Sequence, residues 1–92
     1  MNRSLILGGF RTPIGRRRGV LADTHPAELL GDLMRETLDR LGVDPRWVEQ
    51  VIAGCVTTYG DQAGNIARTA WLTAGLPQDV PGVTVDARCG SR

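Results

Sequence analysis

The run from Gln50 to Val56 restricts the fold of this chain more than any other part of the sequence. It is apolar and contains several β-branched residues, and after Gln50 no polar residues alternate with the apolar ones. A strand with this pattern is typically covered on both faces, as in a parallel sheet flanked by helices. The sequence therefore predicts a layered α/β fold with helices on two sides of a sheet.

Strand and helix patterns alternate along the rest of the chain. The expected elements are a buried strand at 4–8, a loop at 11–24, a helix at 26–41, a short helical turn after 44, the strand at 50–56, a helix at 66–74 and a strand at 82–86. Their order is β-α-β-α-β, without internal repeats or a linker that would separate two domains.

The helix at 26–41 has the strongest pattern. Pro26 suits a first helical turn, leucines form one stripe along the helix, and Gly42 predicts a left-handed cap. Asp44 is expected to cap the short turn that follows, after which Trp47 and Val48 fold back onto the core. Asn65 is expected to cap the second helix, whose inward face is apolar.

Composition excludes several classes of protein. With 92 residues, 41% hydrophobic and 23% charged, the chain fits one ordinary globular unit. A net charge of +1 gives no field that would attract nucleic acid or an anionic membrane. The apolar run near the N-terminus is only three residues long, too short for a signal peptide or a membrane span.

The two cysteines, Cys55 and Cys89, are too few for a disulfide scaffold and lack a metal-binding spacing, so we expect no metal and a cytoplasmic location. Cys55 lies inside an apolar strand, where burial makes a thiol inert. Cys89 instead follows the last strand, where small polar residues of the kind that open a helix begin. The chain is therefore expected to be unfinished at its C-terminal end.

A helix N-terminus would favour the Cys89 thiolate, and the adjacent Arg88 would add positive charge. Position alone fits a small buried residue at a tight turn equally well. The single histidine, His25, precedes the helix-opening proline, which favours an exposed cap neighbour over a base paired with Cys89. The arginines at 16–18 fit a solvated loop better than a phosphate site.

Several segments, taken in order, resemble the opening of the thiolase family, which contains acetyl-CoA acetyltransferases and 3-ketoacyl-CoA thiolases. They cover nearly the whole chain and lie at 11–15, 30–33, 51–56, 62–68, 74–77, 80–81 and 84–91. The last of them, Thr-Val-Asp-Ala-Arg-Cys-Gly-Ser, resembles the active-site cysteine signature of that family. The resemblance implies that residues 1–92 are a partial N-terminal domain of a layered αβαβα fold, ending just after the nucleophile Cys89.

The same resemblance implies a function. Thiolases transfer acyl groups to or from coenzyme A through an acyl-cysteine, by thiolysis of 3-ketoacyl-CoA or condensation of acyl-CoAs, in lipid metabolism that includes fatty acid β-oxidation. No cofactor would be bound permanently, since the coenzyme A thioesters are substrates. The resemblance assigns no residue of this chain to binding them. The full-length enzyme would be a dimer or tetramer in which the strand near Val83 to Val85 pairs with its counterpart.

The family also needs an activating histidine, a second cysteine and oxyanion-hole donors from sequence outside these 92 residues, so the isolated chain should be nearly inactive. Two positions depart from the family's usual pattern: Asp86 stands where Asn is common, and Arg92 where a small residue is usual. Two alternatives stay open, a non-catalytic fragment that acts by protein association and a ketoacyl-synthase-type condensing enzyme. The segments at 11–13 and 65–68 disfavour the latter.

Overall fold

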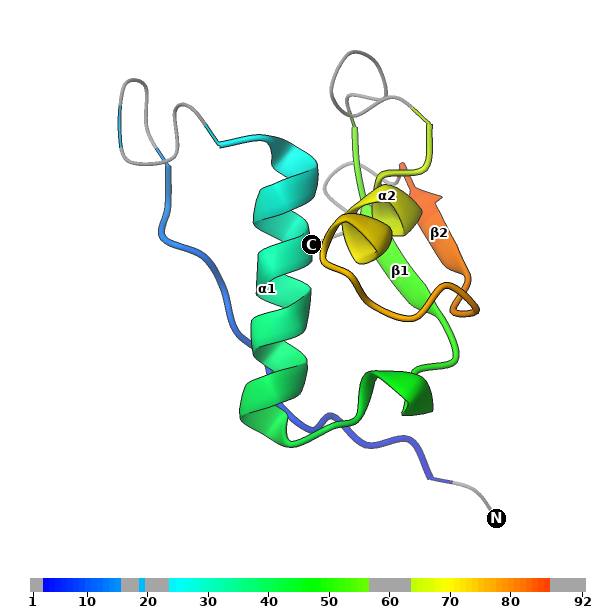
Figure 1. Cartoon of the computed structure of the whole chain (residues 1–92). Helices are drawn as coiled ribbons and strands as arrows, with labels where there is room; N and C mark the ends of the chain where they lie inside the picture. The colour runs from blue at the N-terminus through cyan, green and yellow to red at the C-terminus, as the bar shows by residue number, and fades with distance from the viewer. Residues whose placement is uncertain (1–2, 16–18, 20–23, 57–63, 87–92) are drawn as a thin grey trace.

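The computed structural model describes residues 3–15, 19, 24–56 and 64–86, and within them the chain forms helices beside a parallel pair of strands (Figure 1). In chain order the elements are α1 (Pro26–Leu41), the 3₁₀ turn η1 (Pro45–Trp47), β1 (Val51–Gly54), α2 (Ile66–Thr73) and β2 (Gly82–Val85). The predicted helices and the last two predicted strands are therefore confirmed. The part of the 11–24 loop that the structure describes has no regular structure, as expected.

Helix α1 begins and ends where the sequence predicts. The Nδ1 atom of His25 accepts a hydrogen bond from the Ala27 amide at 3.1 Å, which satisfies one of the amides that the first turn leaves without a helical partner. At the other end Gly42 has φ 68°, in the left-handed region that a glycine adopts at little cost. Its amide donates to the carbonyl of Asp39, so the expected glycine cap is confirmed.

The two strands are parallel, and Val51 lies opposite Gly82 while Gly54 lies opposite Val85. Helix α2 forms the crossover between them and packs on both strands. Backbone hydrogen bonds extend the pairing by one residue at each end, because the Val51 amide donates to Pro81 and the Cys55 amide to Val85. The carboxyl ends of both strands therefore lie at the same edge of the sheet.

Helices α1 and α2 approach each other through small residues. Gly31 is buried, and a Cβ atom at this position would lie 2.5 Å from the Ala70 carbonyl oxygen and 3.2 Å from the Ala74 Cβ. Such distances leave no room for even a methyl group. The absence of a side chain at Gly31 is thus a condition for the observed helix packing.

Among the described residues, the larger apolar cluster lies where α1, α2 and β1 meet. It contains Trp71, Ala74, Leu76 and Val80, with Met34, Leu38, Val48 and Val51 packed around them. The indole N–H of Trp71 donates to the Pro77 carbonyl at 2.6 Å, so the polar atom of this buried ring is satisfied. The predicted inward face of α2 is confirmed, since Ile66, Ala67, Ala70 and Trp71 are all buried.

The expected strand at 4–8 is absent. Residues 3–10 are exposed, with Ile6 at 95% of its full accessibility, and they run past the C-terminal end of α1 (Figure 1). Gly8 lies against the Leu41 side chain, and the Arg40 guanidinium sits 5.5 Å from the centre of the Phe10 ring. The segment contacts a helix, and no described strand pairs with its backbone groups, which is why an apolar run of strand-like composition stays unpaired.

The prediction that the 50–56 strand is covered on both faces is also wrong for the described residues. Val51 and Ala53 are partly buried, whereas Ile52 keeps 67% of its accessibility. Side chains alternate between the faces of a strand, and α1 and α2 both pack on the face that carries Val51 and Cys55. Val83 and Val85 of β2 share the exposed face with Ile52.

The expectation for the turn after α1 differs in part from the structure. Val48 packs against the larger cluster as expected, but Trp47 is 73% exposed. A 3₁₀ turn has three residues per turn, so neighbouring side chains point in different directions and only Val48 faces inward. On the exposed side of α1, Arg40 pairs with Glu36 and Arg35 pairs with Asp32, in each case about one helical turn apart.

Replacing Gly31 with alanine tests the close helix contact. In an open helix this change stabilises by roughly 0.5–1 kcal/mol, because glycine loses more entropy on folding. Here the methyl group must push α2 away, so we expect a loss of about 1–3 kcal/mol in the free energy of unfolding, measured in urea. The control is Gly9→Ala, where nothing lies within 4 Å of the new methyl group. A stabilised Gly31→Ala variant would contradict the observed packing.

The turn η1 is closed by a surface ion pair. Asp44 accepts hydrogen bonds from the Arg46 side chain, at 2.8 Å from Nη2, and from the Arg46 backbone amide at 2.9 Å. The side-chain hydrogen bond, followed by the backbone one, lowers the pKa of Asp44 from its ordinary 3.8 to about 2. The expected N-cap at Asp44 is thereby confirmed.

This pairing predicts a defined pH dependence. The unfolded chain takes up a proton on Asp44 at a higher pH than the folded chain, so the stabilisation from the pair is complete above about pH 4 and is lost as the pH falls toward 2. NMR titration of the Asp44 carboxyl carbon should show a midpoint near pH 2 that Arg46→Gln moves upward. Arg40→Gln removes an arginine that pairs elsewhere and should leave the midpoint unchanged. A normal midpoint in the unaltered chain would contradict the pairing.

Candidate functional site at the carboxyl ends of the strands

The carboxyl ends of both strands and the amino ends of both helices lie at one end of the molecule (Figure 1). A small apolar cluster ties them together: Ala27 from the first turn of α1, Cys55 after β1 and Ile66 at the start of α2 are all buried, with Leu30 packed against them. In open α/β sheets, ligands bind beyond the carboxyl ends of the strands. This end of the molecule is therefore the candidate site.

The predicted nucleophile Cys89 lies outside the described residues, as do Arg92 and the arginines at 16–18. The structure does describe the strand that leads to it. Strand β2 ends at Val85, whose carbonyl accepts from the Cys55 amide at 2.9 Å, and exposed Asp86 follows, three residues before Cys89 in the sequence. The sequence signature of the nucleophile thus begins inside a strand whose position is defined.

Cys55, the other cysteine, is 8% exposed and packs with Ala27 and Ile66. The expectation that it is a buried residue is confirmed. Its place at the candidate end of the molecule comes from its position at the end of β1, and its burial assigns it a packing role.

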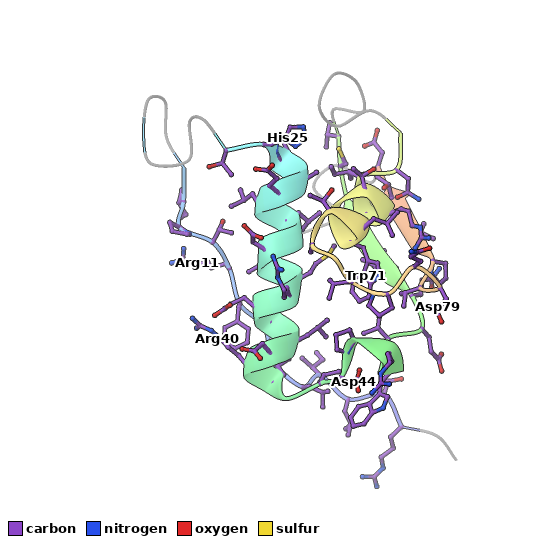
Figure 2. All side chains as sticks on the ribbon, in the orientation of Figure 1. Arg11, His25, Arg40, Asp44, Trp71 and Asp79 are labelled. Carbon is purple, nitrogen blue, oxygen red and sulfur yellow. The ribbon has the colours of Figure 1, made fainter. Side chains whose placement is uncertain are left out.

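His25 stands at the same end of the molecule, at the start of α1 (Figure 2). It is exposed, and its Nδ1 atom caps the helix by accepting from the Ala27 amide. The expectation of an exposed residue at the helix start is confirmed, and the contact shows that the imidazole itself caps the helix. Asp44, whose carboxyl group has the lowered pKa, lies near the opposite end of α1 (Figure 2). Its ion pair with Arg46 is therefore remote from this site.

The first turn of α2 is hydrogen-bonded to β2 through two polar side chains, Asn65 and Thr84. The Thr84 hydroxyl accepts from the Ala67 amide at 3.3 Å and donates to Asn65 Oδ1 at 2.7 Å. Asn65 Nδ2 donates to the Gly82 carbonyl at 2.6 Å, while Oδ1 also accepts from the Arg68 amide at 3.2 Å. We call these four hydrogen bonds the Asn65–Thr84 node.

The node is possible because β2 begins very close to α2. A Cβ atom at Gly82 would lie 2.8 Å from the Arg68 backbone nitrogen and 3.2 Å from the Ala67 carbonyl carbon. Only glycine tolerates such an approach. The strand can therefore come near enough to satisfy amides of the first turn of α2 that lack partners within the helix.

Arg68 anchors the segment between α2 and β2. Its guanidinium donates to the carbonyls of Val80, at 2.6 Å, and of Gln78. Together with the Trp71–Pro77 hydrogen bond, this holds residues 75–81 against the helix. A mobile connection would leave the start of β2 undefined, so these contacts set the place of the strand that precedes Cys89.

Sequence reasoning found Asn65 as a helix cap but missed its link to β2 and the roles of Thr84 and Arg68. One signal was available for Thr84, because it stands between Val83 and Val85 and alternation places its hydroxyl on the opposite face from their side chains. A hydroxyl on the buried face of a strand needs a partner. No local pattern indicated that this partner is the helix cap, nineteen residues earlier.

Two features of the described residues bear on other functions. Within 3–15, 19, 24–56 and 64–86, no group of three or more His, Cys, Asp or Glu residues is arranged to hold a metal ion. Over the same ranges, no helix is both long and apolar enough to cross a membrane.

Comparison with known proteins identifies the family. A model of the thiolase N-terminal domain matches residues 4–92. The chain belongs to the thiolase family. A steroid 3-ketoacyl-CoA thiolase of Mycobacterium tuberculosis is 52% identical to it over 91 residues, which are 99% of this chain and 22% of the relative. A 3-oxoadipyl-CoA/3-oxo-5,6-dehydrosuberyl-CoA thiolase of Escherichia coli is 41% identical over 92 residues, covering 99% of this chain and 23% of that protein.

A solved structure supports the same assignment. The crystal structure of the Bacillus anthracis acetyl-CoA acetyltransferase matches with a TM-score of 0.68 and 40% identity, over 79% of this chain and 18% of that one. The resemblance to thiolases and the incomplete α/β thiolase fold are therefore confirmed. This chain spans less than a quarter of the length of these relatives. The family match favours a thiolase over the ketoacyl-synthase alternative.

Replacing Asn65 tests the node by stability. Asn65→Ala removes both the helix cap and the hydrogen bond to Gly82, so we expect a loss of about 1–2 kcal/mol in the free energy of unfolding. Asn65→Ser keeps a capping oxygen but is too short to bridge to Gly82, and should lose about half as much. Urea unfolding followed by the fluorescence of buried Trp71 measures both. Equal stability of Asn65→Ala and the unaltered chain would exclude a contribution from the node.

Proposed function

We propose that this chain supplies the acyl-accepting cysteine, Cys89, to a thiolase-type reaction on coenzyme A thioesters. The observation that carries the proposal is the family match, which extends over residues 4–92 and so includes the signature around Cys89. The structure adds that β2, the strand leading into this signature, ends at the same edge as β1. That edge is where α/β sheets place their ligands.

In the thiolysis direction, the Cys89 thiolate attacks the ketone carbonyl of a 3-ketoacyl-CoA. The bond between C2 and C3 breaks, the acyl group stays on the sulfur as a thioester, and the departing acetyl-CoA carbanion takes a proton from an acid. The thiolate of a second coenzyme A then attacks the acyl-cysteine and releases the shortened acyl-CoA and the Cys89 thiolate. The covalent intermediate replaces one difficult step with two easier ones.

The 92 residues contain one histidine, His25, and one cysteine besides Cys89. His25 caps α1, and Cys55 is buried in the apolar cluster at the start of both helices. Neither contact gives these residues the role of the activating base or of the second, acid–base cysteine that thiolases use. We therefore propose that the isolated chain does not carry out thiolysis and that the reaction needs groups from additional sequence, with acyl-CoA and coenzyme A as substrates.

A chimera tests this proposal. Residues 1–92 replace the matching segment of the Mycobacterium tuberculosis relative, and thiolysis of a short 3-ketoacyl-CoA is followed by the loss of its enolate absorbance. We expect activity in the chimera, none in the isolated 92-residue chain, and a loss of at least about 10³-fold in kcat for Cys89→Ala, because a nucleophile acts together with its base.

The matched control is Cys55→Ala, which removes a thiol at the same end of the molecule from a buried position. It should keep thiolysis within a few-fold of the unaltered chimera. Circular dichroism of each variant checks that it folds. Activity in the Cys89→Ala chimera within ten-fold of the parent would exclude Cys89 as the nucleophile, and thiolysis by the isolated chain would exclude the need for further groups.

A further inference from the structure

Besides the backbone pairing with β1, strand β2 is held by the side chains of Asn65 and Thr84. On one side the Cys55 amide donates to Val85, the last residue of the strand. On the other side the Thr84 hydroxyl bridges the Ala67 amide and Asn65 Oδ1. Both attachments lie within five residues of Cys89 in the sequence.

We infer that Asn65 and Thr84 are positioning residues for Cys89, which fix the end of β2 against the first turn of α2 and so define where the nucleophile begins. The inference rests on the proposed function of Cys89 and adds the residues on which its placement depends. Neither residue is assigned a contact with substrate. They act through β2, whose end leads to Cys89. Placement of the nucleophile matters because a displacement of about 1 Å costs on the order of 10²-fold in rate.

The geometry supports coupling along the strand rather than a general contribution to stability alone. Thr84 is the residue next to the end of β2, and its hydroxyl uses both its donor and its acceptor capacity within the node. Asn65 likewise uses its amide to reach the Gly82 carbonyl, so residues 82 and 84 are both attached to the same helix turn. Two attachments two residues apart fix the direction of the strand as well as its position.

A first test needs no catalytic activity and uses the 92-residue chain. Native-state hydrogen exchange is measured at the Cys55 amide, which bonds to Val85 and takes no part in the node. Thr84→Val should accelerate its exchange by about ten-fold, because the strand end opens locally, whereas Thr84→Ser should restore protection. Arg40→Gln is the control: it removes one side-chain hydrogen bond, to Glu36 on α1, and should leave Cys55 exchange unchanged.

A second test measures the coupling to Cys89 in the thiolase chimera. Thr84→Val should lower kcat by about ten-fold or more with KM changed less than about two-fold, since placement of the nucleophile is lost and substrate contacts are kept. Thr84→Ser should recover kcat, and Arg40→Gln should keep the parental values. Where Thr84→Val fails to fold, Asn65→Ser gives the same readout, because serine keeps the capping oxygen and loses the link to Gly82.

The outcomes separate the inference from the proposed function. A Thr84→Val chimera with parental kcat, or one no worse than Arg40→Gln, overturns the positioning role while Cys89→Ala stays inactive. Cys55 exchange that is identical in Thr84→Val and the unaltered chain also overturns it. An active Cys89→Ala chimera overturns the proposed function, and with it the role of the node in catalysis, whatever the exchange data show about the strand.

Discussion

The described structure depends on how closely the other elements approach the backbone of α2. Gly31 of α1 and Gly82 of β2 both face this helix without a Cβ atom, and at either position a methyl group would overlap its backbone. Because α2 has small residues where α1 packs, the contact distance is set by backbone atoms rather than by flexible side chains. Contacts of this kind have little freedom to rearrange, since packed interiors tolerate even one added methylene poorly. Helix α2 thereby fixes the places of α1 and β2 together.

The candidate site follows from this arrangement. Once β2 begins against the first turn of α2, the N-terminal amides of that helix can be satisfied by a strand hydroxyl and by a cap that also reaches the strand. The hydrogen bonds that stabilise the helix start are then the same ones that hold the strand leading to Cys89. Under the proposed role of Cys89, folding stability and placement of the nucleophile share one set of contacts. Separate measurements of kcat and KM are therefore needed, besides stability, to distinguish the two.

The sequence determined local features well and their partners poorly. Caps at Gly42 and Asn65 and the inward face of α2 depend on residues within one or two turns, so composition and spacing predict them. The prediction of a strand at 4–8 was wrong because a strand needs a neighbouring strand to pair with. An apolar run contains no information about which backbone will lie beside it. The node around Thr84 was missed for the same reason, since its members come from segments seventeen to nineteen residues apart. The role of Cys89 as a nucleophile was predicted from a family signature, and Cys89 itself lies outside the described residues.

The exposed face of the sheet explains why the strand predicted at 50–56 is confirmed while the prediction that both its faces are covered is wrong. Ile52, Val83 and Val85 are the residue types that a covered strand carries, and all three are exposed on the face opposite α1 and α2. A solvated face of a sheet normally carries polar residues at such positions. The apolar pattern at 50–56 is typical of a strand covered on both faces, whereas the helices in the described part of the chain cover one face. A two-stranded sheet with one open apolar face is weakly stable on its own, so its order here rests on α2 and on the hydrogen bonds that join β2 to it.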